Sequence, residues 1–301
     1  MNIRGHRYGS FAVCYRLQKN DQLRTSFTRL AADTFGLKLN RWYQAGFWDE
    51  RYIPFSYAAG EQIVANVSVS LLDVIIGGRV KKAVQLGTVM THPDYRQQGL
   101  SAALMNKVME AYSGSCDFMY LFANDSVLDF YPRFGFTTAR EELFTAAYGS
   151  QQSLTAKQTF IRKLDGSCSE DLAFIHTFAS RRLPVSQRFG TDGGLGLLMF
   201  YCLNVFSGDL YYLEEEEVIV ICQQEENELH MYDVISRKAP DINAILSKLA
   251  GSSTARIIFH YTPDYSGLEI SSAPYDSGLF VRACSGDAFP GGIKHPATSI
   301  A

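Results

Sequence analysis

The sequence has 301 residues, of which 47% are hydrophobic and 20% are charged, and its formal net charge is −3 at pH 7. This length and composition predict a soluble globular protein of about two domains and exclude a fibrous or disordered chain. A weakly negative chain without a basic patch is not typical of a nucleic-acid binder, so we expect small-molecule partners and no nucleic acid.

The cysteines and the apolar runs indicate where the protein works. Six cysteines are scattered without a zinc-binding spacing, which is typical of free thiols in a reducing compartment and predicts no metal site. The first residues lack the apolar core of a signal peptide, and no apolar run reaches the roughly 18 residues of a membrane span. We therefore expect a cytoplasmic protein that does not bind membranes.

In the first half of the chain, hydrophobic periodicity predicts alternating strands and helices. In chain order these are a strand at 11–17, a helix at 21–35, β-rich runs at 55–59, 62–76 and 79–92, a helix at 100–112, a strand at 118–122, a short helix at 126–134 and a strand at 141–148. Asn20 is a good helix-cap residue, and Gly36 is a typical helix stop. We expect an antiparallel meander that leads into a sheet in which 79–92 and 118–122 are parallel neighbours.

The stretch 84–105 is the most informative one. A β-branched run that Pro93 stops is followed by a polar turn and then by apolar residues at helical spacing, which predicts a strand, a turn and a helix. The turn 96–101 then lies at the helix start, where unpaired backbone N–H groups and the helix dipole favour an anion. Gly99 has no Cβ, so a diphosphate can approach the main chain there. The alternative is an ordinary strand-to-helix turn with a glycine at the helix start.

After a polar stretch at 149–157, the order of elements repeats. The patterns predict a strand at 159–164, helices at 170–182 and 196–206, strands at 210–213, 218–223 and 229–236, a helix at 241–250, and strands at 256–260 and 278–283. We infer a second, divergent lobe. Its strand-to-helix junction, 236–242, has no glycine and is too short to wrap a diphosphate.

The acidic run 214–217 is better explained as a solvated strand edge than as a metal or polyamine site. The predicted organisation is a first lobe at 1–149, a linker at 150–157, a second lobe at 158–285 and a flexible tail at 286–301.

The turn 96–101 (RQQGLS) resembles motif A of the Gcn5-related N-acetyltransferases (GNAT), R/Q-x-x-G-x-G/A, with Ser101 in the last small-residue position. Residues 124–136 resemble motif B of the same family, N-x-x-A-x-x-[LF]-Y-x-x-x-G-F, with Val127 in place of the alanine and an unusual Pro132 after the tyrosine. The resemblance covers roughly residues 11–148. The hairpin at 77–80 and the degenerate second lobe are also similar to the Eis-type acetyltransferases, although the chain lacks room for their third domain.

The resemblance implies an α/β fold of two tandem acyl-CoA N-acyltransferase lobes, with a mixed central sheet flanked by helices and a degenerate second lobe. It implies an enzyme that transfers an acetyl group from acetyl-CoA to the primary amine of a small molecule or peptide. Tyr131 matches the motif B tyrosine that protonates the departing thiolate, and a backbone N–H near Val89 or Met90 would polarise the thioester carbonyl. The expected acetyl-CoA contacts are Thr88, Val89, Met90, Arg96, Gln97, Gln98, Gly99, Leu100, Ser101, Ala102 and Asn124.

Several questions stay open at this point. The aromatic stretch 37–52 is either a short helix packed on the core or, as often in this family, a wall of the acceptor site.

An alternative function is a CoA-responsive binding or regulatory module without turnover, against which the intact Tyr131 argues. We expect one CoA per chain, with the second lobe shaping the acceptor pocket. The acceptor, the acyl group and the formation of a homo-oligomer are open. The candidate general bases are His92, Asp49, Glu50 and the tail carboxylate of Ala301.

Overall fold

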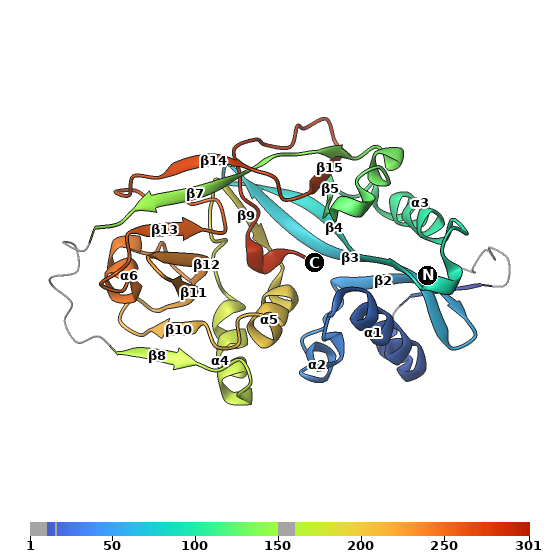
Figure 1. The fold of residues 1–301 in the computed structure, drawn as a ribbon, viewed down its shortest axis with the longest axis horizontal. Coiled ribbons are helices and arrows are strands. Elements are labelled where there is room, and N and C mark those ends of the chain that lie inside the picture. The colour runs from blue at the N-terminus through green and yellow to red at the C-terminus, as the bar shows by residue number, and fades with distance from the viewer. Residues whose placement is uncertain (1–10, 16, 150–159) are drawn as a thin grey trace.

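The computed structural model describes residues 11–15, 17–149 and 160–301, and Figure 1 shows their fold. The predicted linker, residues 150–157, lies outside the described residues. The helices are α1 (Asp21–Phe35), α2 (Leu39–Gln44), α3 (Leu100–Tyr112), α4 (Ser169–Ala179), α5 (Leu195–Asn204) and α6 (Ile242–Leu249). The strands are β1 (Ala12–Cys14), β2 (Tyr52–Ala59), β3 (Gln62–Ile76), β4 (Arg79–Thr91), β5 (Phe118–Phe122), β6 (Thr137–Thr138), β7 (Glu141–Ala147), β8 (Ile161–Leu164), β9 (Phe189–Asp192), β10 (Leu210–Leu213), β11 (Val218–Glu225), β12 (Glu228–Ser236), β13 (Arg256–Phe259), β14 (Ser271–Tyr275) and β15 (Leu279–Ala283).

The first helix begins and ends at the predicted residues. The side chain of Asn20 accepts a hydrogen bond from the backbone N–H of Leu23 at 3.1 Å, which caps one of the free donors of α1. Gly36 has a left-handed φ of 72° and ends the helix. The short helix predicted at 126–134 is instead two 3-10 turns, Asp125–Val127 and Tyr131–Phe134.

The first sheet is built around the long hairpin of β3 and β4. Its strand order is β1-β2-β3-β4-β5-β15-β6, and β9 pairs with the C-terminal end of β3. Strands β4 and β5 are parallel, as the crossover through α3 predicts. Along β3, Ile63 packs in the cluster of α1 and α2, whereas Val64 packs in the cluster of α3. The two helix layers therefore cover opposite faces of the sheet, because successive side chains of a strand alternate in direction.

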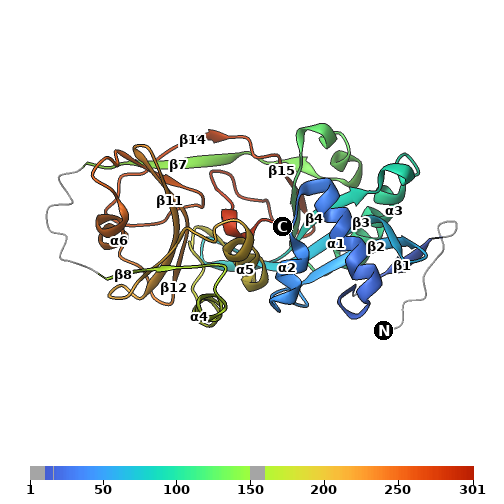
Figure 2. The ribbon, with the colours of Figure 1, turned by 60° about the horizontal axis from the view of Figure 1, so that its bottom comes forward.

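The second sheet forms the core of the second lobe. Its strand order is β14-β7-β13-β12-β11-β10-β8, and α6 packs on it through the buried Ile242, Ile245 and Leu246. Helices α4 and α5 belong instead to the hydrophobic cluster that also holds α1 and α2. Figure 2 shows α5 between the second sheet and α2. This shared core joins the two lobes.

The two sheets also exchange strands, which the sequence did not predict. Strand β7, expected at the end of the first lobe, pairs with β13 and β14 of the second sheet. Strand β15, expected at the end of the second lobe, pairs with β5 of the first sheet. The alternation of side chains along each strand does not specify a partner strand. The predicted boundary near residue 149 therefore divides the sequence but not the sheets.

The flexible tail predicted at 286–301 is wrong for most of its length. Residues 293–296 are buried, and Lys294 Nζ pairs with the buried carboxylate of Glu141 at 2.7 Å. His295 Nε2 and the Tyr120 hydroxyl are 2.9 Å apart, and the backbone N–H of Ala301 donates to the side chain of Gln85. The polar composition suggested a loose segment, but distant buried partners satisfy its polar groups.

The described helices include none that is both long enough and apolar enough to span a membrane.

Candidate active site

A cavity of ≈ 790 Å³ lies where the two lobes meet. Its walls come from the α1 to α2 region, the end of β4, the segment after β5, helix α5 and the C-terminal segment. Both ribbon views place the C-terminal end near this junction of the lobes. The lining residues are Thr34, Phe35, Leu37, Leu39, Trp42, Tyr52, Leu86, Gly87, Thr88, Val89, Met90, Thr91, Arg96, Ser101, Phe122, Asn124, Ser126, Val127, Phe130, Tyr131, Leu197, Phe200, Tyr201, Ile300 and Ala301.

The cavity begins where two parallel strands separate. Strands β4 and β5 pair only from Ala83 opposite Phe118 to Leu86 opposite Leu121, although β4 continues to Thr91. Beyond Leu86, the C-terminal segment approaches β4 so closely that a Cβ on Gly87 would lie 2.6 Å from the Ala301 carbonyl oxygen. Glycine is therefore required at this position.

A β-bulge follows in β4 at Thr88 and Val89. The register with β3 shifts here, and Thr88 has a left-handed φ of 49°. A bulge interrupts the ladder of main-chain hydrogen bonds, so polar groups of the strand become available to a ligand. A non-glycine residue in this conformation is held by its surroundings and is often part of a functional site.

Buried polar groups hold this bulge. The side-chain amide of Asn66 donates to the Thr88 carbonyl oxygen and to Ser68 Oγ, both at 2.9 Å, and Ser56 Oγ donates to Asn66 Oδ1 at 2.7 Å. The hydroxyls of Tyr52 and Thr88 share a further hydrogen bond of 2.7 Å. Burial raises the pKa of Tyr52 to about 12, so this phenol stays neutral. Hydrogen bonds to both the backbone carbonyl and the side-chain hydroxyl of Thr88 thus hold the bulge.

The predicted turn 96–101 lies at the start of α3. Gln97 and Gly99 have left-handed φ values of 60° and 74°, and no side chain caps the helix at Gly99. A Cβ on Gly99 would have no neighbour within 4 Å, so the approach to the first turn of α3 is open. Ser101 Oγ and Thr91 Oγ1 are 2.7 Å apart and tie the turn to β4. Uncapped N–H groups in open space fit the diphosphate that the sequence predicts here.

The expected cofactor residues divide into two groups. Lining the cavity are Thr88, Val89, Met90, Arg96, Ser101 and Asn124. The others lie in the turn or in the first turn of α3, outside the lining: Gln97, Gln98, Gly99, Leu100 and Ala102. The side chain of Leu100 is buried in the α3 core, so this residue can offer a ligand only its main chain.

Tyr131 lies in the same cavity as the bulge. Its ring packs on Phe130 and Phe280 at centroid distances of 5.2 and 5.8 Å. Burial raises its pKa to about 12, so the phenol is protonated at neutral pH. No described residue hydrogen bonds with its hydroxyl. The side chain is thus held by packing and has a free proton donor.

The residues left open as general bases lie in different places. Ala301 lines the cavity, and His92 lines a separate one beside α1. Asp49 accepts a hydrogen bond from the Arg51 backbone at 2.9 Å outside the main cavity, and burial raises its pKa. Glu50 is exposed and does not line the cavity.

The sequence led us to expect that the second lobe shapes the acceptor pocket, but it did not indicate which residues of that lobe line the cavity. Leu197, Phe200 and Tyr201 of α5 line the cavity, and the Tyr201 hydroxyl donates to the Ile300 carbonyl oxygen at 2.9 Å. The run 195–204 is apolar on all sides, which indicates a buried helix but not the surface that it meets.

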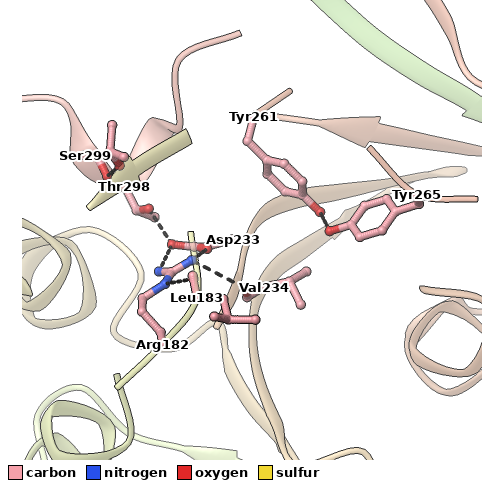
Figure 3. A network of polar contacts seen from close by, with 9 residues as sticks. Arg182, Leu183, Asp233, Val234, Tyr261, Tyr265, Thr298 and Ser299 are labelled. Atoms are coloured by element: carbon pink, nitrogen blue, oxygen red, sulfur yellow. Dashed lines mark hydrogen bonds and ion pairs between the residues drawn. The ribbon is translucent and has the colours of Figure 1, made fainter. Parts of the chain in front are cut away.

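The second lobe has a similar pair of parallel strands, but different side chains lie where these strands separate. Strands β12 and β13 pair only up to Met231 opposite Phe259, and the register of β12 with β11 shifts just beyond. Figure 3 shows Asp233 in this region, where it accepts hydrogen bonds from Arg182 at 2.6 and 2.8 Å and from Thr298 Oγ1 at 2.6 Å. The hydroxyls of Tyr261 and Tyr265 are 2.7 Å apart nearby. Side chains of the chain itself therefore pair with the polar groups of this opening, and a separate cavity of ≈ 610 Å³ lies beside it at the start of α6.

Comparisons with known proteins agree with this architecture. Residues 17–139 match the model of the acetyltransferase (GNAT) domain. A GCN5-related N-acetyltransferase from Kribbella flavida aligns over 91% of this chain and 71% of its own, with 14% identity and a TM-score of 0.57. Eis1 from Mycobacterium abscessus aligns over 91% and 74%, with 15% identity and a TM-score of 0.57. No curated protein matches the sequence significantly.

The structural likeness extends over both lobes, so the predicted α/β fold of tandem GNAT lobes is confirmed. The family match lies on the lobe that carries the bulge, the uncapped helix and Tyr131. Residues 17–139 therefore carry a GNAT acetyltransferase domain, which places this protein among the enzymes of the acyltransferase class.

Proposed function

We propose that this enzyme transfers an acetyl group from acetyl-CoA directly to the primary amine of a small molecule or peptide. The observation that carries the proposal is the meeting of three features around one cavity. These are the separated strands with the bulge at Thr88, the uncapped start of α3 at Gly99, and the free hydroxyl of Tyr131. Each feature matches one requirement of acyl transfer from a thioester.

The start of α3 suits the diphosphate of acetyl-CoA. Its free N–H groups and dipole favour negative charge, and the open space outside Gly99 admits a bulky group. The separated strands would then take the thioester arm toward Thr88, where residues of β4 line the cavity. Holding the thioester and the amine together in this way contributes several orders of magnitude to the rate.

The chemistry follows from the groups around the arm. The amine nitrogen attacks the thioester carbonyl carbon, and a main-chain N–H near Val89 or Met90 stabilises the oxyanion that forms. Collapse of this intermediate breaks the C–S bond. Tyr131 then gives its proton to the departing thiolate and regains one that the amine has released. The products are an amide and the free thiol of CoA.

The Tyr131→Phe variant tests this assignment. The change keeps the ring and its packing but removes the proton donor, so turnover should fall about 100-fold while the affinity for acetyl-CoA stays nearly unchanged. Thiol release measures turnover, and calorimetry measures affinity. In the wild type, the pKa of about 12 also predicts no loss of turnover through Tyr131 until the pH approaches that value.

Tyr112→Phe is the matched control, because Tyr112 packs on Phe55 outside the cavity. Wild-type turnover in Tyr131→Phe, under conditions where chemistry limits the rate, would assign the proton to another group. Acetyl-CoA binding without thiol release for any amine would favour a CoA-responsive regulatory module.

A further inference from the structure

The acceptor side of the cavity has a continuous aromatic wall. The ring of Trp42 meets Tyr52 edge to face at a centroid distance of 5.2 Å and meets Phe200 at 5.9 Å. Phe200 in turn contacts Tyr201 at 5.8 Å. All four rings line the cavity, and they come from α2, β2 and α5. Both lobes therefore build this wall.

The polar atoms of this wall already have partners inside the protein. Trp42 Nε1 donates to the Gly196 carbonyl oxygen at 2.8 Å, and the Tyr52 hydroxyl bonds with Thr88. The Tyr201 hydroxyl donates to Ile300. Burial raises the pKa of both tyrosines, so neither ring carries charge. A ligand in contact with this wall meets mainly apolar ring surface, and its own hydroxyl or ammonium groups would lose water without replacement.

The charges around the cavity also favour an apolar ligand over one with several ammonium groups. Among the described residues that line it, none is Asp or Glu, and Arg96 is the charged side chain. Arg96 belongs to the turn before α3, and its Nε donates to the Thr91 carbonyl oxygen at 3.3 Å. The nearby Asp49 faces Gly196 and Arg51 outside the cavity. Several ammonium groups in this cavity would have no carboxylate partner besides the main-chain carboxylate of Ala301, and burial of the remaining unpaired charges is strongly unfavourable.

We infer that the acceptor is a monoamine whose single primary amino group is attached to an aromatic or aliphatic apolar body, and not a polyamine or an amino sugar. This inference rests on the proposed function, because it identifies the substrate class of the same site. The apolar body packs on Phe200 and Leu197, with the buried Trp42 supporting Phe200, and the amino group points to the thioester near Thr88. The one amino group must lose its charge to react, so it requires no permanent carboxylate partner.

The test compares three amines as acceptors: 2-phenylethylamine, spermidine and glucosamine. Thiol release from acetyl-CoA should give a kcat/KM for 2-phenylethylamine at least about tenfold above that of the other two, which is the discrimination that apolar pockets commonly reach. An equal or higher kcat/KM for spermidine or glucosamine would overturn the inference and leave the proposed function standing.

A variant pair locates the effect. Phe200→Asp places a carboxylate in the wall and should lower kcat/KM for 2-phenylethylamine about tenfold or more, with little change in acetyl-CoA affinity. Val205→Asp adds the same charge at the exposed end of α5 and should change neither quantity. An unchanged kcat/KM for 2-phenylethylamine in Phe200→Asp would contradict the proposed wall.

Amine binding to the protein saturated with CoA separates this inference from the proposed function. Calorimetry of that complex requires no chemistry. Binding of 2-phenylethylamine that Phe200→Asp removes, without thiol release in the wild type, would support the apolar monoamine as the ligand of this wall and reject acetyl transfer. The absence of 2-phenylethylamine binding to this complex would overturn the inference.

Discussion

The two strand-to-helix junctions of this chain have the same outline and opposite chemistry. Between β4 and α3, the first-turn N–H groups have no side-chain cap, and the backbone turns through left-handed positions at Gln97 and Gly99. Between β12 and α6, the Asp241 carboxylate accepts hydrogen bonds from the N–H groups of Asn243 and Ala244 at 3.0 and 3.2 Å. One helix start is open to an anion, and the other already holds one.

The strands before the two helices also differ in whether their polar groups are free or already paired. After β4 and β5 separate, Tyr131 and the bulge at Thr88 face a cavity. After β12 and β13 separate, the buried Asp233 binds Arg182 and Thr298. The same supersecondary unit therefore serves binding where its polar groups are free and serves packing where its own side chains satisfy them. We propose that only the first junction binds acetyl-CoA.

The largest change in acetyl-CoA affinity should come from blocking the junction between β4 and α3. Gly99→Glu places a carboxylate where the diphosphate is expected, so the affinity for acetyl-CoA should fall by at least about 1,000-fold, or about 4 kcal/mol. Calorimetry measures the loss. Gly99→Ala is the control for the strain of a side chain at φ 74°, and Gly114→Glu adds the same charge near the other end of α3. Wild-type affinity in Gly99→Glu would show that this turn does not hold the cofactor.

The next effect concerns the packed opening of the second lobe. Asp233→Ala leaves the largely buried guanidinium of Arg182 without its partner, so the free energy of unfolding should fall by about 3 kcal/mol. Denaturant unfolding measures it. The acetyl-CoA affinity of the folded protein should stay close to that of the wild type. Asp287→Ala, which removes an exposed carboxylate paired with Lys81, should change stability little.

If Asp233→Ala lost acetyl-CoA binding at a temperature where it remains folded, the second lobe would have more than a packing role. That result would remove the proposed contrast between the two lobes.

A smaller effect is expected from the support of the bulge. Asn66→Leu removes the amide that holds the Thr88 carbonyl oxygen, so kcat/KM should fall about tenfold and the free energy of unfolding by about 1–3 kcal/mol. Thiol release and denaturant unfolding measure the two quantities. Asn243→Leu changes an exposed amide on α6 and should leave kcat/KM unchanged. Wild-type kcat/KM in Asn66→Leu would mean that the bulge does not need this support.

The open junction was predictable from the sequence because its signals are local. Pro93 stops the strand, Gly99 opens the turn and the helical spacing starts immediately afterwards, all within one short stretch. The cap at Asp241 is equally local, and the sequence already indicated that this junction could not wrap a diphosphate. The tandem fold followed from the repeated order of elements.

The remaining features depend on contacts between distant residues. Nothing within β7 or β15 specifies the sheet that it joins. Lys294 and Thr298 indicate a solvated tail until their partners Glu141 and Asp233 are known, and these lie 153 and 65 residues away. Likewise, the apolar run of α5 indicates burial, but its place in the acceptor wall depends on how the two lobes pack.

The number of acetyl-CoA molecules bound per chain tests the contrast between the junctions most directly. Calorimetric titration of the whole protein should give a stoichiometry near one, and Gly99→Glu should show no remaining site. Two sites per chain, or one site that survives in Gly99→Glu, would contradict the account in which the first junction binds the cofactor and the second only packs.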